Sequence, residues 1–322
     1  MQADEVLTST VSVADGNRHL RVGIASVLLA HVIWGFFPLY WRLLGSISAF
    51  SLTAHRIVWS FLIAALLCTA IKPLRNRLWR RHPPRTLAIH AIAAFMIGIN
   101  WVAFLYAVNS GHVLQSALGY YINPLVNVML GVVILKERLT RLQTFAVVLA
   151  AIGVSVMSLV GDGIPWLSLV MAFSFGFYAL LKKQASLGAI EGLTLETGTL
   201  LPFALCYLLW LSPGVEMSVA PAIDPGNVPS ATAAYSAGTW AMLIFGGALT
   251  LSPLTLFAFA APRVPLSMIG ILQYIGPTLQ WICGAVLLSE PVSKSQLAGF
   301  GFVWAGILVF VVSGLRQRKQ NA

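Results

Sequence analysis

Residues 118–125 read LGYYINPL, and residues 271–278 read ILQYIGPT. The two segments share a Tyr, an Ile and a Pro in the same register, 153 residues apart. The same offset carries Gly153 to Gly306. Self-similarity at a constant offset indicates two copies of one structural unit.

The earlier part of each copy matches at a smaller offset. A shift of 141 residues carries Gly35 to Gly176 and Thr53 to Thr194. The difference between the two offsets is absorbed by a long acidic loop at 212–238. The repeat therefore extends over nearly the whole chain.

The composition lies outside the range of soluble proteins. Of the 322 residues, 58% are hydrophobic and 9% are charged, and the mean hydropathy is +0.84. Soluble domains carry about 25% charged residues. Apolar runs near the ~20 residues that cross a bilayer recur at 22–41, 51–71, 87–108, 113–135, 143–160, 165–183, 191–211, 239–260, 265–288 and 295–314. We expect an all-α fold, a polytopic membrane protein with ten transmembrane helices.

Each copy of the repeat holds five of these spans. Because five is odd, the second copy is expected to cross the membrane in the opposite direction to the first, as in secondary transporters. The sequence thus predicts two inverted five-helix repeats, at 21–161 and 162–315. A disordered tail at 1–20 is expected to precede them, and a basic tail at 316–322 to follow.

The basic residues fall on one side of this arrangement. Seventeen of the 20 Lys and Arg residues, Lys182 among them, lie in segments on the side of both termini. Arg42 and Lys294 lie on the other side, and Arg56 lies within a span. Since cytoplasmic loops carry the excess of Lys and Arg, both termini are expected in the cytoplasm. The bias also accounts for the net charge of +10 without nucleic acid as a partner.

Few ionisable side chains lie within the spans. Charges at mid-membrane are costly and are functional candidates by default. His55 and Arg56 enter the second span from one face, and Glu196 stands at the equivalent depth of the seventh. We interpret them as solute- or proton-binding groups of a central cavity, with Arg56 and Glu196 too far apart to pair. Structural charges bonded to a neighbouring helix remain the alternative.

A second set of candidates consists of amide and aromatic side chains near mid-membrane. Pro124 and Pro277 remove a helical hydrogen bond at equivalent places in the two copies and predict a pair of broken helices, although packing kinks remain open. Trp34, Tyr40 and Trp41 resemble a cavity-lining aromatic patch, and an interfacial aromatic belt is the favoured interpretation for Tyr40 and Trp41. The candidate pathway residues of this set are Trp34, Asn100, Trp101, Tyr120, Tyr121, Asn123, Gln273 and Tyr274.

The sequence carries no Walker A loop, dinucleotide fingerprint or metal-spaced His pair, so no catalytic residue, metal or cofactor is expected. Glu137 and Glu290 follow the ends of spans among basic residues. We expect them to form surface salt bridges that contribute little to stability. Two other classes stay open beside a transporter: a membrane enzyme acting on a lipid-linked substrate, and a non-transporting sensor or assembly partner.

Seven motifs resemble the EamA-type drug/metabolite transporters, and within them the RarD-like permeases. The resemblance covers residues 20–315. The motifs are IWGFFPLYW at 33–41, AHRIVWS at 54–60, NW at 100–101, AVN at 107–109, LGYYINPL at 118–125, LET at 195–197 and QYIGPT at 273–278.

This resemblance implies a ten-helix permease of the plasma (inner) membrane whose relatives move small metabolites or drugs. We expect a secondary transporter that works by alternating access, an exporter coupled to the proton gradient, with a small molecule and the lipid bilayer as its partners. Gln115 departs from the family pattern, in which this position is usually acidic, and this bears on proton coupling.

The charge bias yields a topology prediction. A cysteine introduced at residue 225 should react with a membrane-impermeant maleimide added to intact cells, whereas one at residue 78 should react only after lysis. The reason is that residue 225 lies in the acidic loop and residue 78 in the most basic one. Labelling of residue 78 from outside would contradict both the orientation and the inverted repeat.

Overall fold

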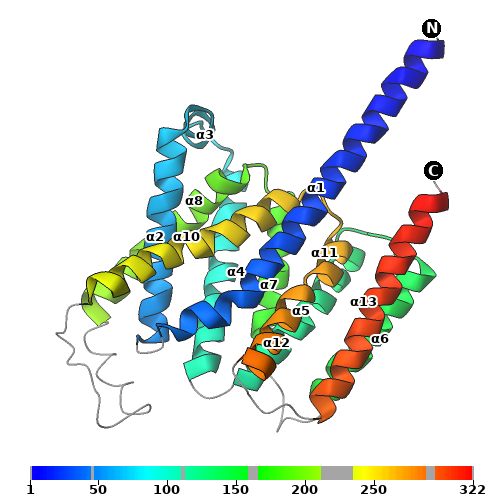
Figure 1. The fold of residues 1–322 in the computed structure, drawn as a ribbon. Helices are drawn as coiled ribbons and strands as arrows, with labels where there is room; N and C mark the ends of the chain where they lie inside the picture. Colours follow the sequence, from blue (N-terminus) through cyan, green and yellow to red (C-terminus); the bar gives the residue numbers. More distant parts are fainter. Residues whose placement is uncertain are drawn as a thin grey trace.

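The computed structural model describes residues 2–44, 47–109, 113–158, 166–211, 235–287 and 294–320. Within these ranges the regular structure is all helical, without strands (Figure 1). The α-helices are α1 (Gln2–Arg42), α2 (Ala49–Ala70), α3 (Lys72–Leu78), α4 (Pro84–Asn109), α5 (Val113–Val133), α6 (Arg141–Ser158), α7 (Trp166–Gln184), α8 (Ala189–Cys206), α10 (Ala237–Ala260), α11 (Leu266–Leu272), α12 (Ile275–Ile282) and α13 (Lys294–Gln320). Two π-helical turns, η1 (Tyr207–Leu211) and η3 (Cys283–Leu287), extend α8 and α12.

Short polar side chains begin two of the long helices. Ser48 Oγ accepts the backbone N–H of Ser51 at the start of α2, at 3.2 Å. Ser236 Oγ accepts the N–H of Thr239 at the start of α10, at 3.1 Å. Each cap satisfies an N–H that has no carbonyl partner within the helix. Pro84 begins α4, where its missing N–H costs nothing.

Among the described residues, five helices are long and apolar enough to cross a membrane. They lie at Arg18–Trp41, Phe50–Ala70, Pro84–Phe104, Ala189–Trp210 and Ala237–Ala260. Shorter apolar helical segments lie at Gly119–Val133, Arg141–Val156 and Leu297–Phe310. Large apolar side chains on their outward faces are exposed, such as Leu66, Phe203 and Leu308. A helical protein with this surface is suited to lipid rather than water.

Residues 2–20 are helical, where the sequence predicted a disordered tail. Helix α1 begins at Gln2 and continues without interruption into the first apolar span. The segment contains no proline and a single glycine, Gly16. A helix nucleated in the span therefore meets no strong breaker as it extends toward the N-terminus.

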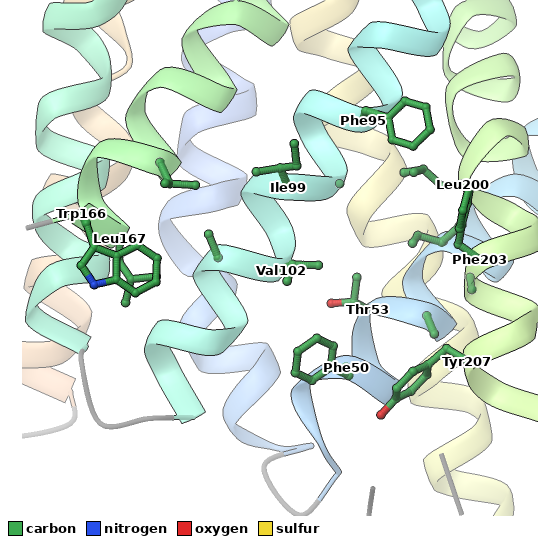
Figure 2. Close-up of a pocket in the computed structure, with 16 residues that line it drawn as sticks. Phe50, Thr53, Phe95, Ile99, Val102, Trp166, Leu167, Leu200, Phe203 and Tyr207 are labelled. Atoms are coloured by element: carbon green, nitrogen blue, oxygen red, sulfur yellow. The ribbon is translucent and has the colours of Figure 1, made fainter. Parts of the chain in front are cut away.

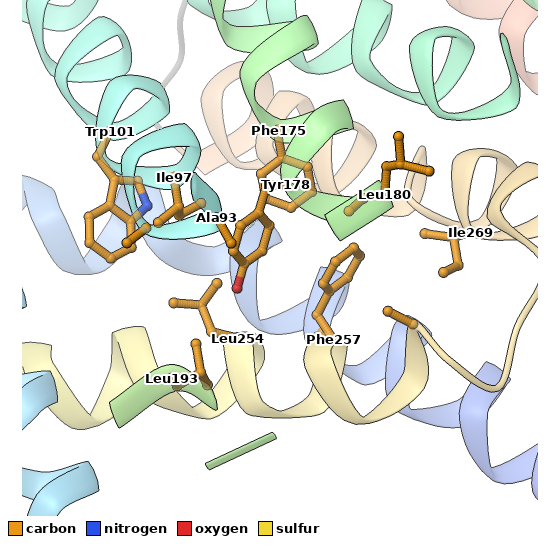
Figure 3. Packing of buried hydrophobic residues seen from close by; sticks show 14 of the residues in the cluster. Ala93, Ile97, Trp101, Phe175, Tyr178, Leu180, Leu193, Leu254, Phe257 and Ile269 are labelled. Carbon is orange, nitrogen blue, oxygen red and sulfur yellow. The ribbon is translucent and has the colours of Figure 1, made fainter. Parts of the chain in front are cut away.

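A central aromatic cluster joins α1, α7 and α10, and Figure 3 shows its members Phe175, Tyr178 and Phe257. Phe257 is fully buried and stacks on Tyr178, with ring centroids 6.3 Å apart. The ring centroid of Phe257 also lies 5.4 Å from that of Phe175 and 5.9 Å from that of Trp34. Aromatic pairs of this kind add to the free energy of burial, so the cluster ties the first helix to the second half of the chain.

Helices α6 and α13 lie side by side at the edge of the molecule (Figure 1). A Cβ on Gly153 would stand 2.5 Å from the carbonyl oxygen of Gly299, and one on Gly306 would stand 2.6 Å from that of Ala146. The two backbones therefore approach more closely than any larger residue allows. Small residues permit this close packing between membrane helices.

This contact predicts unequal effects of two substitutions in α13. Gly306→Leu should overpack the interface and destabilise the protein by roughly 1–3 kcal/mol. Gly301→Leu is the matched control, because nothing lies within 4 Å of a Cβ placed there. Apparent unfolding midpoints in detergent would measure both effects. Equal midpoints for the two variants would contradict this packing.

Candidate functional site

The helix that carries Gln273 and Tyr274 is interrupted at these two residues. Helix α11 ends at Leu272 and α12 begins at Ile275. Two residues into α12, Pro277 has no N–H to offer the Gln273 carbonyl, which instead accepts from Gly276 at 3.1 Å. The Gln273 side chain is buried and accepts a hydrogen bond from Asn127 Nδ2 at 2.5 Å. Residues of the α5 segment thus brace this break.

The expected counterpart of this break at Pro124 is absent. Helix α5 runs continuously from Val113 to Val133 through Pro124. Asn123 precedes this proline, whereas Gly276 precedes Pro277, and glycine favours the helix less. Dense packing against α7 and α11 also holds α5 together. Asn123 is buried, and its Oδ1 has no hydrogen-bond partner among the described residues.

Tyr121 and Tyr274, the equivalent tyrosines of the two copies, lie together. Their rings stack with centroids 6.3 Å apart, and Tyr121 meets Phe300 of α13 edge-on at 4.9 Å. Both tyrosines belong to an apolar cluster formed with α6 and α13. The structure therefore brings these two candidates together, but in a packed cluster distinct from the surroundings of Arg56.

Arg56 lies between two indole rings. Its guanidinium carbon is 4.7 Å from the ring centroid of Trp41 and 4.8 Å from that of Trp101. Its Nε donates a hydrogen bond to Thr250 Oγ1 at 3.0 Å. Helices α1, α2, α4 and α10 all contribute to this site. We call Arg56, Trp41, Trp101 and Thr250 the arginine site.

The charge of Arg56 is only partly compensated. The side chain is 6% exposed, and none of the ion pairs between described residues includes it. Two cation–π contacts supply roughly 0.5–2 kcal/mol each, whereas burying an ion costs several kcal/mol. Trp41 was expected in an interfacial belt, with a cavity-lining aromatic patch as the alternative, and its contact with Arg56 favours the alternative. A hydropathy pattern does not show which residues of different helices are neighbours, so the sequence could not reveal this contact.

Glu196 has a separate and complete set of partners. Its Oε1 accepts from His90 Nδ1 at 2.7 Å and from Lys182 Nζ at 2.8 Å, and its Oε2 accepts from the Tyr178 hydroxyl at 3.3 Å. Glu196, His90 and Lys182 are each at most 2% exposed. We call these four residues the glutamate cluster. It connects α4, α7 and α8.

Lys182 was expected among the loop charges on the cytoplasmic side. It lies instead in the last turn of α7, inside the protein. A lysine at the end of an apolar run reads equally well as a snorkelling surface charge, which is why the sequence did not reveal its role. His90 lies within the predicted span 87–108, but nothing in the sequence linked it to Glu196.

Three further candidates connect neighbouring helices. Asn100 Nδ2 donates to the Met171 carbonyl at 2.8 Å and joins α4 to α7. His55 packs edge-on against Trp240, with centroids 5.5 Å apart. Trp34 belongs to the central aromatic cluster, and its carbonyl accepts from Gln280 at 3.0 Å. The side chain of Gln115 lies outside the described residues.

Glu137 was expected to form a surface salt bridge, and it does pair with Lys183, but it also binds the start of a helix. Its two carboxylate oxygens accept the backbone N–H groups of Leu266 at 2.7 Å and Ser267 at 2.9 Å. These are the first residues of α11, where N–H groups lack helical partners and the helix dipole favours an anion. Lys183 lies 4.0 Å away. The corresponding Glu290 lies outside the described residues.

An apolar groove of about 560 Å³ lies between α2, α4, α7 and α8 (Figure 2). Its walls include Phe95, Ile99 and Phe203, whose side chains are largely exposed. Thr53 and Tyr207 supply polar atoms at one end, and their hydroxyls have no partner among the described residues.

The glutamate cluster predicts a stability effect that depends on charge balance. Lys182→Met should destabilise the protein by roughly 3–5 kcal/mol, because it leaves a buried carboxylate with one cationic partner fewer. Lys182→Met with Glu196→Leu should recover part of this loss. Lys72→Met, at an exposed lysine of α3, is the control and should have little effect. Unfolding midpoints in detergent would measure all three, and an unchanged midpoint for Lys182→Met would refute the pairing.

Comparison with known proteins places the chain in a family. The EamA-like transporter family model matches residues 21–159. The chain is 41% identical to the uncharacterised transporter YojE of Bacillus subtilis, over 94% of this chain and 97% of that protein. It is 38% identical to the protein RarD of Streptomyces exfoliatus, over 94% and 91%. One solved crystal structure, 17% identical, shares the fold with a TM-score of 0.63 over 90% of this chain and 98% of that one. The chain is therefore a multi-pass membrane protein that belongs to the EamA-like transporter family and resembles its RarD members.

Proposed function

We propose that this chain is a secondary transporter that moves a small organic solute outward across the plasma membrane by alternating access. In this proposal ten spans form two inverted five-helix repeats, with both termini in the cytoplasm. The proton gradient drives the cycle, and the buried ionisable groups of the glutamate cluster carry the proton. The single observation that carries the proposal is the reciprocal packing between the two copies.

Equivalent glycines of the two copies pack on equivalent residues of the opposite copy. A Cβ on Gly35 of α1 would stand 2.6 Å from Leu279 of α12, and a Cβ on Gly176 of α7 would stand 2.6 Å from Val126 of α5. The offset of 141 relates the two glycines, and the offset of 153 relates Val126 to Leu279. Two homologous units that exchange contacts in this way are suited to rocking against one another about a central site.

The other helix pairs support the same relation. Gly153 and Gly306, which the offset of 153 relates, each pack against the partner's backbone in the contact between α6 and α13. Tyr121 and Tyr274 stack on each other. A pseudo-two-fold axis between the copies explains why equivalent residues meet. Helices α6 and α13 then form the periphery, and the remaining spans surround the pathway.

Transport in liposomes tests this function directly. Purified protein should catalyse counterflow of at least one member of a panel of small organic metabolites and drugs, and an imposed proton gradient should drive its accumulation. Gln273→Ala should reduce the initial rate at least tenfold, because it removes the partner of Asn127 at the break between α11 and α12. Leu308→Ala, at an exposed position of α13, is the control and should retain the rate.

Three outcomes would overturn parts of this proposal. Equal sensitivity of the two variants would contradict the placement of the pathway. Flux that ignores the proton gradient would refute the coupling. Chemical conversion of a lipid-linked compound without movement of any solute would favour the membrane-enzyme alternative.

A further inference from the structure

The arginine site contains hydrogen-bond donors and positive charge in excess of acceptors. The structure gives the Arg56 guanidinium one hydrogen bond to a described residue, from Nε to Thr250. The indole Nε1 of Trp41 is buried and has no acceptor among the described residues. Trp59, one turn further along α2, has a second buried indole N–H that finds no acceptor among the described residues. Both groups can only donate.

Thr250 does not remove this excess. Its hydroxyl accepts from Arg56 and donates to the Gly246 carbonyl at 2.7 Å, so both of its functions are engaged. No described carboxylate lies within ion-pair distance of Arg56, and Glu196 is engaged with His90 and Lys182. The described part of the chain therefore supplies no anionic acceptor for the donors of this site.

We propose that the arginine site binds the carboxylate of a small organic monoanion, with the aromatic walls holding the apolar body of that anion. This inference rests on the proposed transport function and specifies its substrate class. The planar guanidinium offers two parallel N–H groups that match the two oxygens of a carboxylate. The Trp41 and Trp101 rings both contact the guanidinium and limit its movement.

The single charge of the site selects against dianions. A monocarboxylate would neutralise Arg56 and leave the buried site without net charge. A phosphate monoester carries nearly two negative charges at neutral pH, so its excess charge would stay in a medium of low dielectric constant, where it is costly. A neutral amide offers one acceptor and adds N–H groups to a site that already has surplus donors.

Binding of matched aromatic probes tests this proposal without knowledge of the natural solute. Benzoate and phenylacetate should quench the intrinsic tryptophan fluorescence of the purified protein in a saturable way, because Trp41 and Trp101 form the walls of the site. Benzamide and phenylacetamide, the neutral counterparts, should bind at least tenfold more weakly, and phenyl phosphate should also bind more weakly than benzoate.

Variants of two arginines assign the effect to the site. Arg56→Gln should lose benzoate binding by at least tenfold, and Arg56→Lys should retain an intermediate affinity because it keeps the charge without the fork. Arg263→Gln is the matched control, since Arg263 also lies over an aromatic ring, that of Phe259, but is exposed outside this site. It should bind benzoate like the parent protein.

The outcomes separate this inference from the proposed function. Equal affinity for benzoate and benzamide in the unmodified protein would overturn the inference, even if Arg56 variants fail to fold. Counterflow of neutral solutes that competes with no carboxylate would overturn it and leave the transporter proposal standing. Selective, Arg56-dependent binding of benzoate without any flux would support the site and refute transport.

Discussion

Inside a bilayer no water is present to satisfy a polar group, and this constraint decides where the polar side chains of this chain lie. Small hydroxyls bond to carbonyls one turn earlier in their own helix, as Thr197 does to Leu193 at 2.7 Å. Larger groups need a partner on another helix. Asn100 and Glu196 find theirs across α4, α7 and α8, so the polar contacts fix which helices are neighbours.

The all-helical character of the chain could be predicted from the sequence, because the bilayer sets the length of each apolar run. Contacts between side chains on different helices could not be predicted. Lys182 and Glu196 stand 14 residues apart on different helices, and only the turn between α7 and α8 brings them together. Trp41 looks like an interfacial residue until α2 places Arg56 against its ring.

The two prolines show how a repeated motif can give two local structures. Pro124 and Pro277 occupy equivalent positions, and each removes one helical hydrogen bond. The chain before Pro277 breaks, whereas α5 continues through Pro124. A difference of one residue before the proline, glycine against asparagine, changes helix propensity by a few tenths of a kcal/mol. Such a small difference becomes decisive only together with tertiary contacts, which a sequence pattern does not specify.

The glycine contact between α6 and α13 has a mechanical consequence. Two helices whose backbones touch leave no room for a lipid chain between them and cannot slide without breaking several close contacts at once. A helix whose apolar length does not match the local hydrocarbon thickness responds by tilting. Because α6 and α13 are locked together, a thicker or thinner bilayer tilts the pair as one body, and the neighbouring α5 and α11 feel that tilt through their contacts with it.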